Sequence, residues 1–227
     1  MGIGAAAQAV GDPVYLMAAG TLLRLPVFPL AGAVLFPRAQ LPLHIFEPRY
    51  RAMLRDALAG DRLIGMVQPR DEREPPALFD VGCIGRIASA EERADGRFDI
   101  VLDGLSRFRI VREAEVDTPY RQVDASRDGF GDEEEADPLG LAQRAELERE
   151  ARRYADALGY DVEWAAVERI DDETLVNGIC QIAPLDVGSK QALLEAGGLD
   201  MRADLLVQFM QFQRMAPGGA DGPETLQ

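Results

Sequence analysis

The sequence has few of the side chains from which metal centres and nucleophilic sites are built. Its 227 residues include two cysteines, Cys83 and Cys180, and one histidine, His44. A structural zinc site takes four cysteine or histidine ligands, so this set cannot form one. We therefore expect no metal and no other cofactor. We also expect two reduced thiols, which are typical of cytoplasmic proteins.

Positive charge is scarce as well. Lys190 is the only lysine, and 39 acidic residues against 24 basic ones give a formal net charge of −15. Charge of that sign repels phosphate backbones and anionic lipid surfaces. No run reaches the roughly 20 apolar residues of a membrane-spanning helix. We therefore expect a soluble, cytoplasmic protein without a nucleic-acid or membrane partner, whose oligomeric state the composition leaves open.

The composition changes twice along the chain, and these changes divide it into parts. Residues 126–137 carry six acids against one arginine, which predicts a solvated linker. Short apolar runs broken by proline and glycine predict strands before the linker, and helix-forming residues predict a bundle after it. The expected parts are an N-terminal extension (1–20), a β-rich lobe with one helix (21–125), the linker (126–137), a helical bundle (138–215) and a disordered tail (216–227).

Within the β-rich lobe, apolar residues spaced by three and four predict one helix. Tyr50 and Leu54 lie on its apolar face, and Gly60 is a natural end. Gly96 and Gly104 each follow an aspartate, and this pair predicts a tight turn between strands at both places.

No complete catalytic motif is present. Ser106 stands in a partial nucleophile-elbow motif, but Phe108 replaces its last glycine and His44 lies upstream of the serine. A Ser–Lys dyad would need Lys190, and its neighbour Ser189 faces elsewhere on a helix because adjacent helix residues do not meet. The phosphate-binding motif of P-loop ATPases is missing too.

Several short motifs in a fixed order point to one family. LPVFPL, LFP and LPLHIFEPRY occur within residues 25–58, and FDVGCIGRI, RFDIVLDGLSRFRIV and a KQALLE segment follow. Together they resemble the LON substrate-binding domain, the N-terminal domain of Lon-type ATP-dependent proteases, over residues 22–213. The resemblance implies an α+β fold in which a β-rich, PUA-like pseudo-barrel lobe precedes a C-terminal helical bundle.

The resemblance also carries a functional expectation. The chain would be a stand-alone LON domain, without the ATPase and protease modules of Lon, and therefore not an enzyme. It would bind unfolded or extended protein segments, as an adaptor or regulator in protein quality control, with a protease or chaperone as a further partner. The expected surface is an apolar groove between lobe and bundle, with exposed edge strands that accept an added strand.

Two groups of residues follow from this expectation. The polypeptide-binding candidates are Phe36, His44, Phe46, Arg49, Phe209 and Phe212. The residues expected to maintain the fold, by packing the helix against the strands or by charge-assisted hydrogen bonds, are Pro29, Phe46, Glu47, Arg49, Tyr50, Gly104, Arg107 and Lys190.

Two alternatives stay open. One is an ATP-independent hydrolase or peptidase that uses Lys190 or His44. The other is RNA binding by the PUA-like lobe, against which the net charge of −15 argues.

Overall fold

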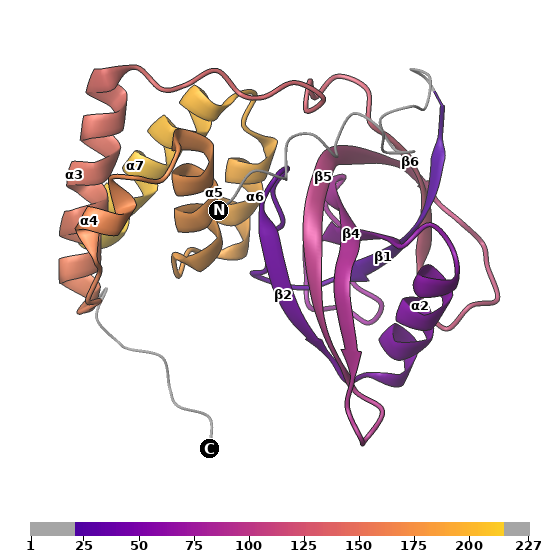
Figure 1. Ribbon diagram of the computed structural model, residues 1–227. Helices are drawn as coiled ribbons and strands as arrows, with labels where there is room; N and C mark the ends of the chain where they lie inside the picture. The colour runs from indigo at the N-terminus through magenta and orange to yellow at the C-terminus, as the bar shows by residue number, and fades with distance from the viewer. Residues whose placement is uncertain (1–20, 216–227) are drawn as a thin grey trace. The chain divides into compact units, whose positions relative to one another are not determined.

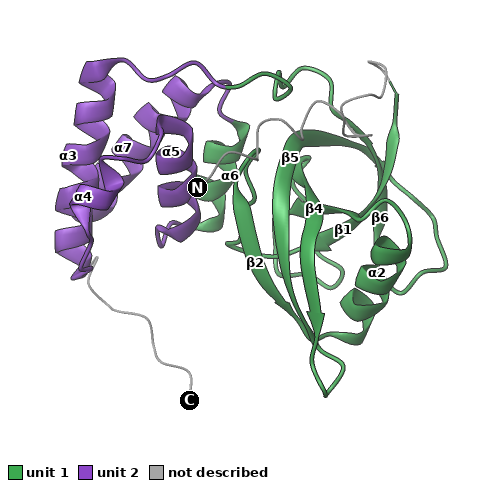
Figure 2. Cartoon of the chain, viewed as in Figure 1, with its two compact units in different colours: residues 1–135, 186–195 green, residues 136–185, 196–227 purple. Residues whose placement is uncertain are grey.

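The structure is a computed structural model that describes residues 21–215. The predictions for residues 1–20 and 216–227 therefore lie outside the described residues. The chain divides into two compact units, shown in different colours in Figure 2. We call residues 21–135 and 186–195 the strand unit, and residues 136–185 and 196–215 the helical unit.

The strand unit is built on one mixed sheet of six strands (Figure 1). The strand order is β2-β5-β4-β3-β1-β6, and β5 also pairs with β6. Strands β5, β4, β3, β1 and β6 thus close a ring, while β2 pairs only with β5. All pairs are antiparallel except β1 with β3. The strands are β1 (Leu23–Pro29), β2 (Gln40–Ile45), β3 (Leu63–Val67), β4 (Val81–Glu92), β5 (Phe98–Glu113) and β6 (Gln122–Ser126).

Helix α2 (Pro48–Ala59) packs against β1. Pro48 occupies the first turn, where its missing N–H is tolerated, and the helix ends at Gly60. Tyr50 and Leu54 are buried as their spacing predicted, and the rings of Tyr50 and Phe28 lie 4.4 Å apart. The helix therefore buries its apolar face against the strands.

The burial of this face has a measurable consequence. Leu54 is completely buried, so replacing it with alanine should lower the free energy of unfolding by about 2–5 kcal/mol, through lost apolar contact and the cavity left behind. Chemical denaturation measures the change. Arg55→Ala is the matched control, because Arg55 is exposed on the same helix, where it pairs with Glu92 and lies over the ring of Phe98. A loss below about 0.5 kcal/mol for Leu54→Ala would mean that the helix face is not buried.

One of the two predicted turns is wrong. Gly96 has a positive φ of 77° in the hairpin between β4 and β5, as expected. Gly104 makes no turn, because β5 continues through it from Phe98 to Glu113. A β-carbon at Gly104 would lie 1.9 Å from the carbonyl oxygen of Phe36. Glycine is needed there because another part of the main chain passes close by.

Helix α6 (Val187–Glu195) groups with the strand unit, although its sequence predicted a place in the helical bundle. Polar contacts hold it there. Lys190 Nζ donates to the carbonyl of Gly32 at 2.9 Å, and Gln191 Nε2 donates to the carbonyl of Val81 at 3.0 Å. Gln68 Nε2 donates to Gln191 Oε1 at 3.1 Å. Buried amides and an ammonium group need such partners, which the strands provide.

The acidic segment is only partly solvated. Residues 133–135 are exposed, but Asp132 is buried against Arg107 of β5. Its carboxylate accepts from Arg107 Nη2 at 2.8 Å and from the main-chain N–H of Arg107 at 2.7 Å. Arg107 also donates to the carbonyls of Phe130 and Leu194. One buried arginine therefore binds the acidic segment and the end of α6 to the sheet.

The helical unit consists of α3 (Leu141–Leu158), α4 (Trp164–Val167), α5 (Asp172–Ile182) and α7 (Leu199–Met215). Asp171 caps α5 by accepting from the N–H of Thr174. Ile182, the last residue of α5, is 75% exposed. Among residues 21–215, no helix is long and apolar enough to cross a membrane.

Candidate functional site

The most exposed of the predicted binding residues in the strand unit lie where β2 leads into α2. Side chains along a strand alternate between its two faces. Gln40, Pro42 and His44 are exposed, and Phe46 continues this alternation beyond the end of the strand. Phe46 is 57% exposed, so it does not pack the helix against the strands as one part of the sequence analysis proposed. It remains available for contact with a ligand.

His44 is held in place by a carboxylate on the neighbouring strand. His44 Nδ1 lies 2.7 Å from Asp99 Oδ1, and Arg93 Nε donates to Asp99 Oδ2 at 2.6 Å. These hydrogen bonds, first that of Arg93 and then that of His44, lower the pKa of Asp99 below its usual value. The rings of His44 and Phe46 are stacked with centroids 6.2 Å apart. The result is a pair of exposed rings beside an ionised carboxylate.

Glu47 and Arg49 form the corner between strand and helix. Arg49 Nε donates to Glu47 Oε2 at 2.9 Å. The Arg49 guanidinium also lies over the ring of Tyr50, 4.6 Å from its centroid, and 3.6 Å from the carboxylate of Glu74. Arg49 is therefore engaged on several sides, and its contacts stabilise the corner beside Phe46.

The other binding candidates do not join this group. Phe36 is completely buried in the strand unit and cannot touch a ligand without a rearrangement. Phe209 and Phe212 lie on α7 of the helical unit, where Phe209 is half-buried and Phe212 is 71% exposed. Within the strand unit, three candidates therefore lie at this corner: His44, Phe46 and Arg49, the first two with their rings stacked.

The residues expected to maintain the fold are placed as follows. Pro29 ends β1 opposite Val67, half-buried. Lys190 is 7% exposed and binds the carbonyl of Gly32. Its neighbour Ser189 instead donates its hydroxyl to Asp186 at 2.5 Å. The hydroxyl of Ser189 and the ammonium group of Lys190 therefore bond to different residues. Within residues 21–215, no group of three or more histidine, cysteine, aspartate or glutamate side chains is arranged to hold a metal ion.

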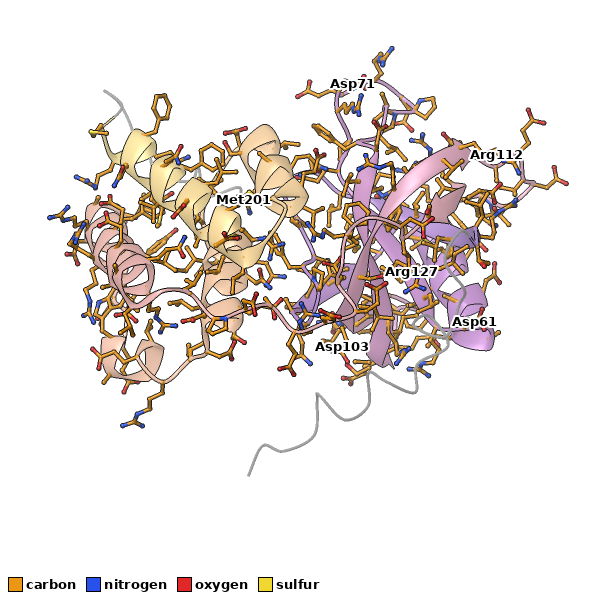
Figure 3. All side chains as sticks on the ribbon, turned by 90° about the horizontal axis from the view of Figure 1, so that it is seen from above. Asp61, Asp71, Asp103, Arg112, Arg127 and Met201 are labelled. Atoms are coloured by element: carbon orange, nitrogen blue, oxygen red, sulfur yellow. The ribbon has the colours of Figure 1, made fainter. Side chains whose placement is uncertain are left out.

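A shallow pocket of about 170 Å³ lies elsewhere on the strand unit. Its lining includes Asp56 and Asp61 near the end of α2, together with Tyr120 and Gln122. Figure 3 labels Asp61 beside this helix. The Tyr120 hydroxyl donates to Asp56 Oδ2 at 2.8 Å. Burial first, and then this hydrogen bond, raise the pKa of Tyr120 to about 12.

The raised pKa of Tyr120 predicts a loss of stability at alkaline pH. The unfolded chain releases this proton near pH 10, before the folded chain does. The stabilisation is therefore fully present below about pH 10 and is lost as the pH rises toward 12, by about 3 kcal/mol in total. Near-ultraviolet titration of phenolate absorbance measures the ionisation of Tyr120 in the folded protein, with the Tyr120→Phe variant for comparison. Ionisation of Tyr120 near pH 10 in the folded protein would contradict the prediction.

One signal in the sequence was overlooked. Pro42 stands inside β2, and proline lacks the N–H that a central strand donates to its neighbours. Proline within a run of strand residues therefore indicates an edge strand. The burial of Asp132 had no comparable signal, because it depends on the distant Arg107.

The strand ring with its added β2, together with a separate set of helices, defines an α+β protein with an exposed aromatic corner. Residues 24–211 match the family model of the ATP-dependent protease La (LON) substrate-binding domain. The chain therefore belongs to the LON substrate-binding domain family, as the sequence motifs suggested.

Two curated relatives illustrate the match. Lon protease 2 of Myxococcus xanthus is 31% identical over 201 residues, which cover 84% of this chain. The Lon protease of Anaeromyxobacter dehalogenans is 28% identical over 227 residues, which cover 94% of it. The aligned regions are 24% and 26% of those two proteins, so the chain spans about a quarter of their length.

Two solved structures support the fold. A crystal structure of a Lon N-terminal domain protein from Xanthomonas campestris matches with a TM-score of 0.60 and 23% identity, covering 83% of this chain and 99% of that one. The N-terminal domain of the Mycobacterium avium complex Lon protease matches with a TM-score of 0.63 and 19% identity, covering 83% and 98%. At these identities the likeness concerns the fold.

Proposed function

We propose that this chain is a non-enzymatic binding module for unfolded or extended polypeptide segments. The observation that carries the proposal is its membership of a family described by substrate binding, over residues 24–211. The exposed rings of His44 and Phe46 support it, because aromatic side chains at the surface offer a large contact area for apolar segments. The chain would act as an adaptor or regulator in protein quality control, with a protease or chaperone as a partner.

We place this action in the cytoplasm. Cys83 and Cys180 are both buried thiols rather than a disulfide, which suits a reducing compartment. Binding of nucleic acid or of a membrane surface is no part of the proposal, because the net charge of −15 opposes both. A salt-dependent mobility shift with RNA would favour the RNA-binding alternative instead.

The direct test compares one protein in two states. The probe is fluorescently labelled lysozyme, unfolded by reduction, with its cysteines capped by neutral carboxamidomethyl groups. Its fluorescence anisotropy should rise when this chain is added. Native lysozyme is the matched control, since it carries a similar positive charge and differs in being folded. We expect the unfolded form to bind at least about tenfold more tightly. Equal binding of the two forms would reduce the proposal to charge attraction, and no binding would refute it.

A hydrolase is the second candidate, favoured by one observation. The contact of His44 with Asp99 is the arrangement in which a carboxylate orients a histidine base. Within residues 21–215, however, no serine, threonine or cysteine is hydrogen-bonded to His44. Assays on casein and on ester substrates decide between the candidates. Activity that His44→Ala or Lys190→Ala abolishes would replace the binding proposal with a catalytic one.

A further inference from the structure

Strand β2 has one edge that no other described strand covers. The strand order places β2 at the end of the sheet, paired on one side with β5. Each of the other five strands pairs with at least two strands, and β5 pairs with three, because β5 and β6 close the ring. Main-chain N–H and C=O groups along an open edge can pair with an additional strand. Among residues 21–215, β2 is therefore the strand that pairs with only one other strand, and its second edge can accept an added strand.

The register identifies the groups that face this open edge. Gly104 N donates to the carbonyl of Ala39 at 2.8 Å, and this is the ladder bond that precedes the pair Gln40–Asp103, whose own main-chain groups then face away from each other. Hydrogen-bonded pairs alternate along an antiparallel ladder with pairs whose main-chain groups point away. Gln40, Pro42 and His44 therefore direct their main-chain groups outward. Pro42 fits this position, because it has no N–H to donate to β5.

The side chains of β2 are also unusual for an open edge. Natural edge strands are commonly protected by charged residues, lysine above all. Residues 40–45, QLPLHI, contain no lysine, arginine, aspartate or glutamate, in a chain of which 28% is charged. Pro42 removes one donor, but the N–H groups of Gln40 and His44 and three carbonyl groups remain. The edge is thus only partly blocked.

The two faces of β2 indicate which side chains an added strand would bring. Leu41 and Leu43 are half-buried, while their partners on β5, Leu102 and Ile100, are buried. The apolar layer therefore continues to the edge and is incompletely covered there. Apolar side chains at alternate positions of an added strand would cover it. On the opposite face, Phe46 offers an aromatic contact.

The acidic residues beside β2 limit the charge of a polypeptide segment that could bind there. Asp99 and Asp103 lie on β5 opposite His44 and Gln40, and Asp103, labelled in Figure 3, accepts from Gln40 Nε2 at 2.8 Å. With a net charge of −15 on the whole chain, an acidic segment would be repelled. A neutral or basic segment would not.

We infer that the outer edge of β2 binds an extended polypeptide segment by strand addition, and that the segment alternates apolar residues and lacks net negative charge. This inference rests on the proposed function and assigns a surface and a mode to it. The main chain of the segment would pair with Gln40, Pro42 and His44. Its apolar side chains would contact Leu41 and Leu43 on one face, with Phe46 on the other.

Amide hydrogen exchange tests the mode directly. The probe is a short peptide of alternating valine and threonine with a lysine at each end. At saturation it should slow exchange of the Gln40 and His44 amides at least about tenfold, and change Leu41 and Leu43 little, because those already bond to β5. The same peptide N-methylated at every valine and threonine keeps its side chains but loses the main-chain donors of both edges, and it should not bind. Tight binding of the methylated peptide would overturn the inference.

A pair of variants tests the edge from the protein side. His44→Pro and His44→Thr both remove the contact with Asp99, but only the proline removes an outward N–H. We expect His44→Pro to weaken peptide binding about tenfold relative to His44→Thr. Equal affinities would contradict strand addition. Should His44→Pro not fold, the exchange experiment on the unaltered chain decides alone.

The failure of this inference can be told apart from failure of the proposed function. If unfolded lysozyme binds while Gln40 and His44 gain no protection from the valine–threonine peptide, the edge assignment is wrong and polypeptide binding stands. If the chain binds neither probe, the proposed function itself fails.

Discussion

Replacing Arg107 with methionine should lower the free energy of unfolding of the strand unit by about 4 kcal/mol. Arg107 and Asp132 have side chains that are only 4% and 7% exposed, with Nη2 and Oδ1 2.8 Å apart. Methionine fills similar space but leaves a buried carboxylate without its counter-charge, and leaves the carbonyls of Phe130 and Leu194 without their donor. An uncompensated buried charge is among the most destabilising changes.

Circular dichroism during urea unfolding, together with amide exchange on β5, measures this loss. Tryptophan fluorescence would follow the other unit, because the single tryptophan, Trp164, lies in the helical unit. Arg97→Met is the control. Arg97 Nη2 is 2.5 Å from Asp95, closer than in the buried pair, but both side chains are nearly half exposed, so we expect a much smaller loss than for Arg107→Met. Similar losses for the two variants would show that burial does not set the strength of the Arg107 pair.

A double variant separates the effect of the unpaired charge from the effect of altered packing. The double variant Arg107→Met with Asp132→Leu removes both charges and should recover part of the stability lost in Arg107→Met. If the double variant is less stable than Arg107→Met alone, the hydrogen bonds that Asp132 still accepts outweigh the cost of its unpaired charge. That result would contradict our explanation.

Gly104→Ala should destabilise the protein at least as much as Arg107→Met does, lowering the free energy of unfolding by about 4 kcal/mol or more. The new β-carbon would lie 1.9 Å from the carbonyl oxygen of Phe36 and 3.3 Å from that of Ala39. Neither atom can move by a rotamer change, because both belong to the main chain. Hydrogen bonds also hold the segment on both sides, from Gly104 N to Ala39 and from Arg38 N to Gly104, each 2.8 Å. Either β5 or the segment before β2 must shift.

Gly178→Ala is the matched control for this substitution. Gly178 lies inside α5, and no atom is within 4 Å of a β-carbon built there. Alanine should therefore stabilise the helix by about 0.5–1 kcal/mol. Thermal or urea unfolding of the two variants gives the comparison. A Gly104→Ala protein as stable as the parent would show that Phe36 and Gly104 do not approach as closely as described.

Much of the secondary structure could be predicted because its signals are local. The apolar spacing of Tyr50 and Leu54 identified the buried face of α2, and Gly60 identified its end. Dipeptides were less reliable. Asp95-Gly96 and Asp103-Gly104 are alike in sequence, yet only the first makes a turn, because the second is passed closely by the carbonyl of Phe36.

The candidate site was only partly predictable. His44, Phe46 and Arg49 follow one another in the chain, so their proximity was assured by the sequence itself. Phe36 stands close to them in sequence as well, but it is buried. Hydrophobicity alone cannot separate an exposed aromatic residue from a core residue, because the difference depends on what the rest of the chain places over it.

The family, the α+β class and the positions of most helices and strands were determined by the sequence alone, through residue spacing and motifs that act over a few neighbours. Tertiary structure decided the rest: the pairing of Arg107 with Asp132, the grouping of α6 with the strands, and the open edge of β2. Each of these depends on contacts between residues far apart in the chain. Local periodicity shows that a group will be buried or paired, and only the fold shows with which partner.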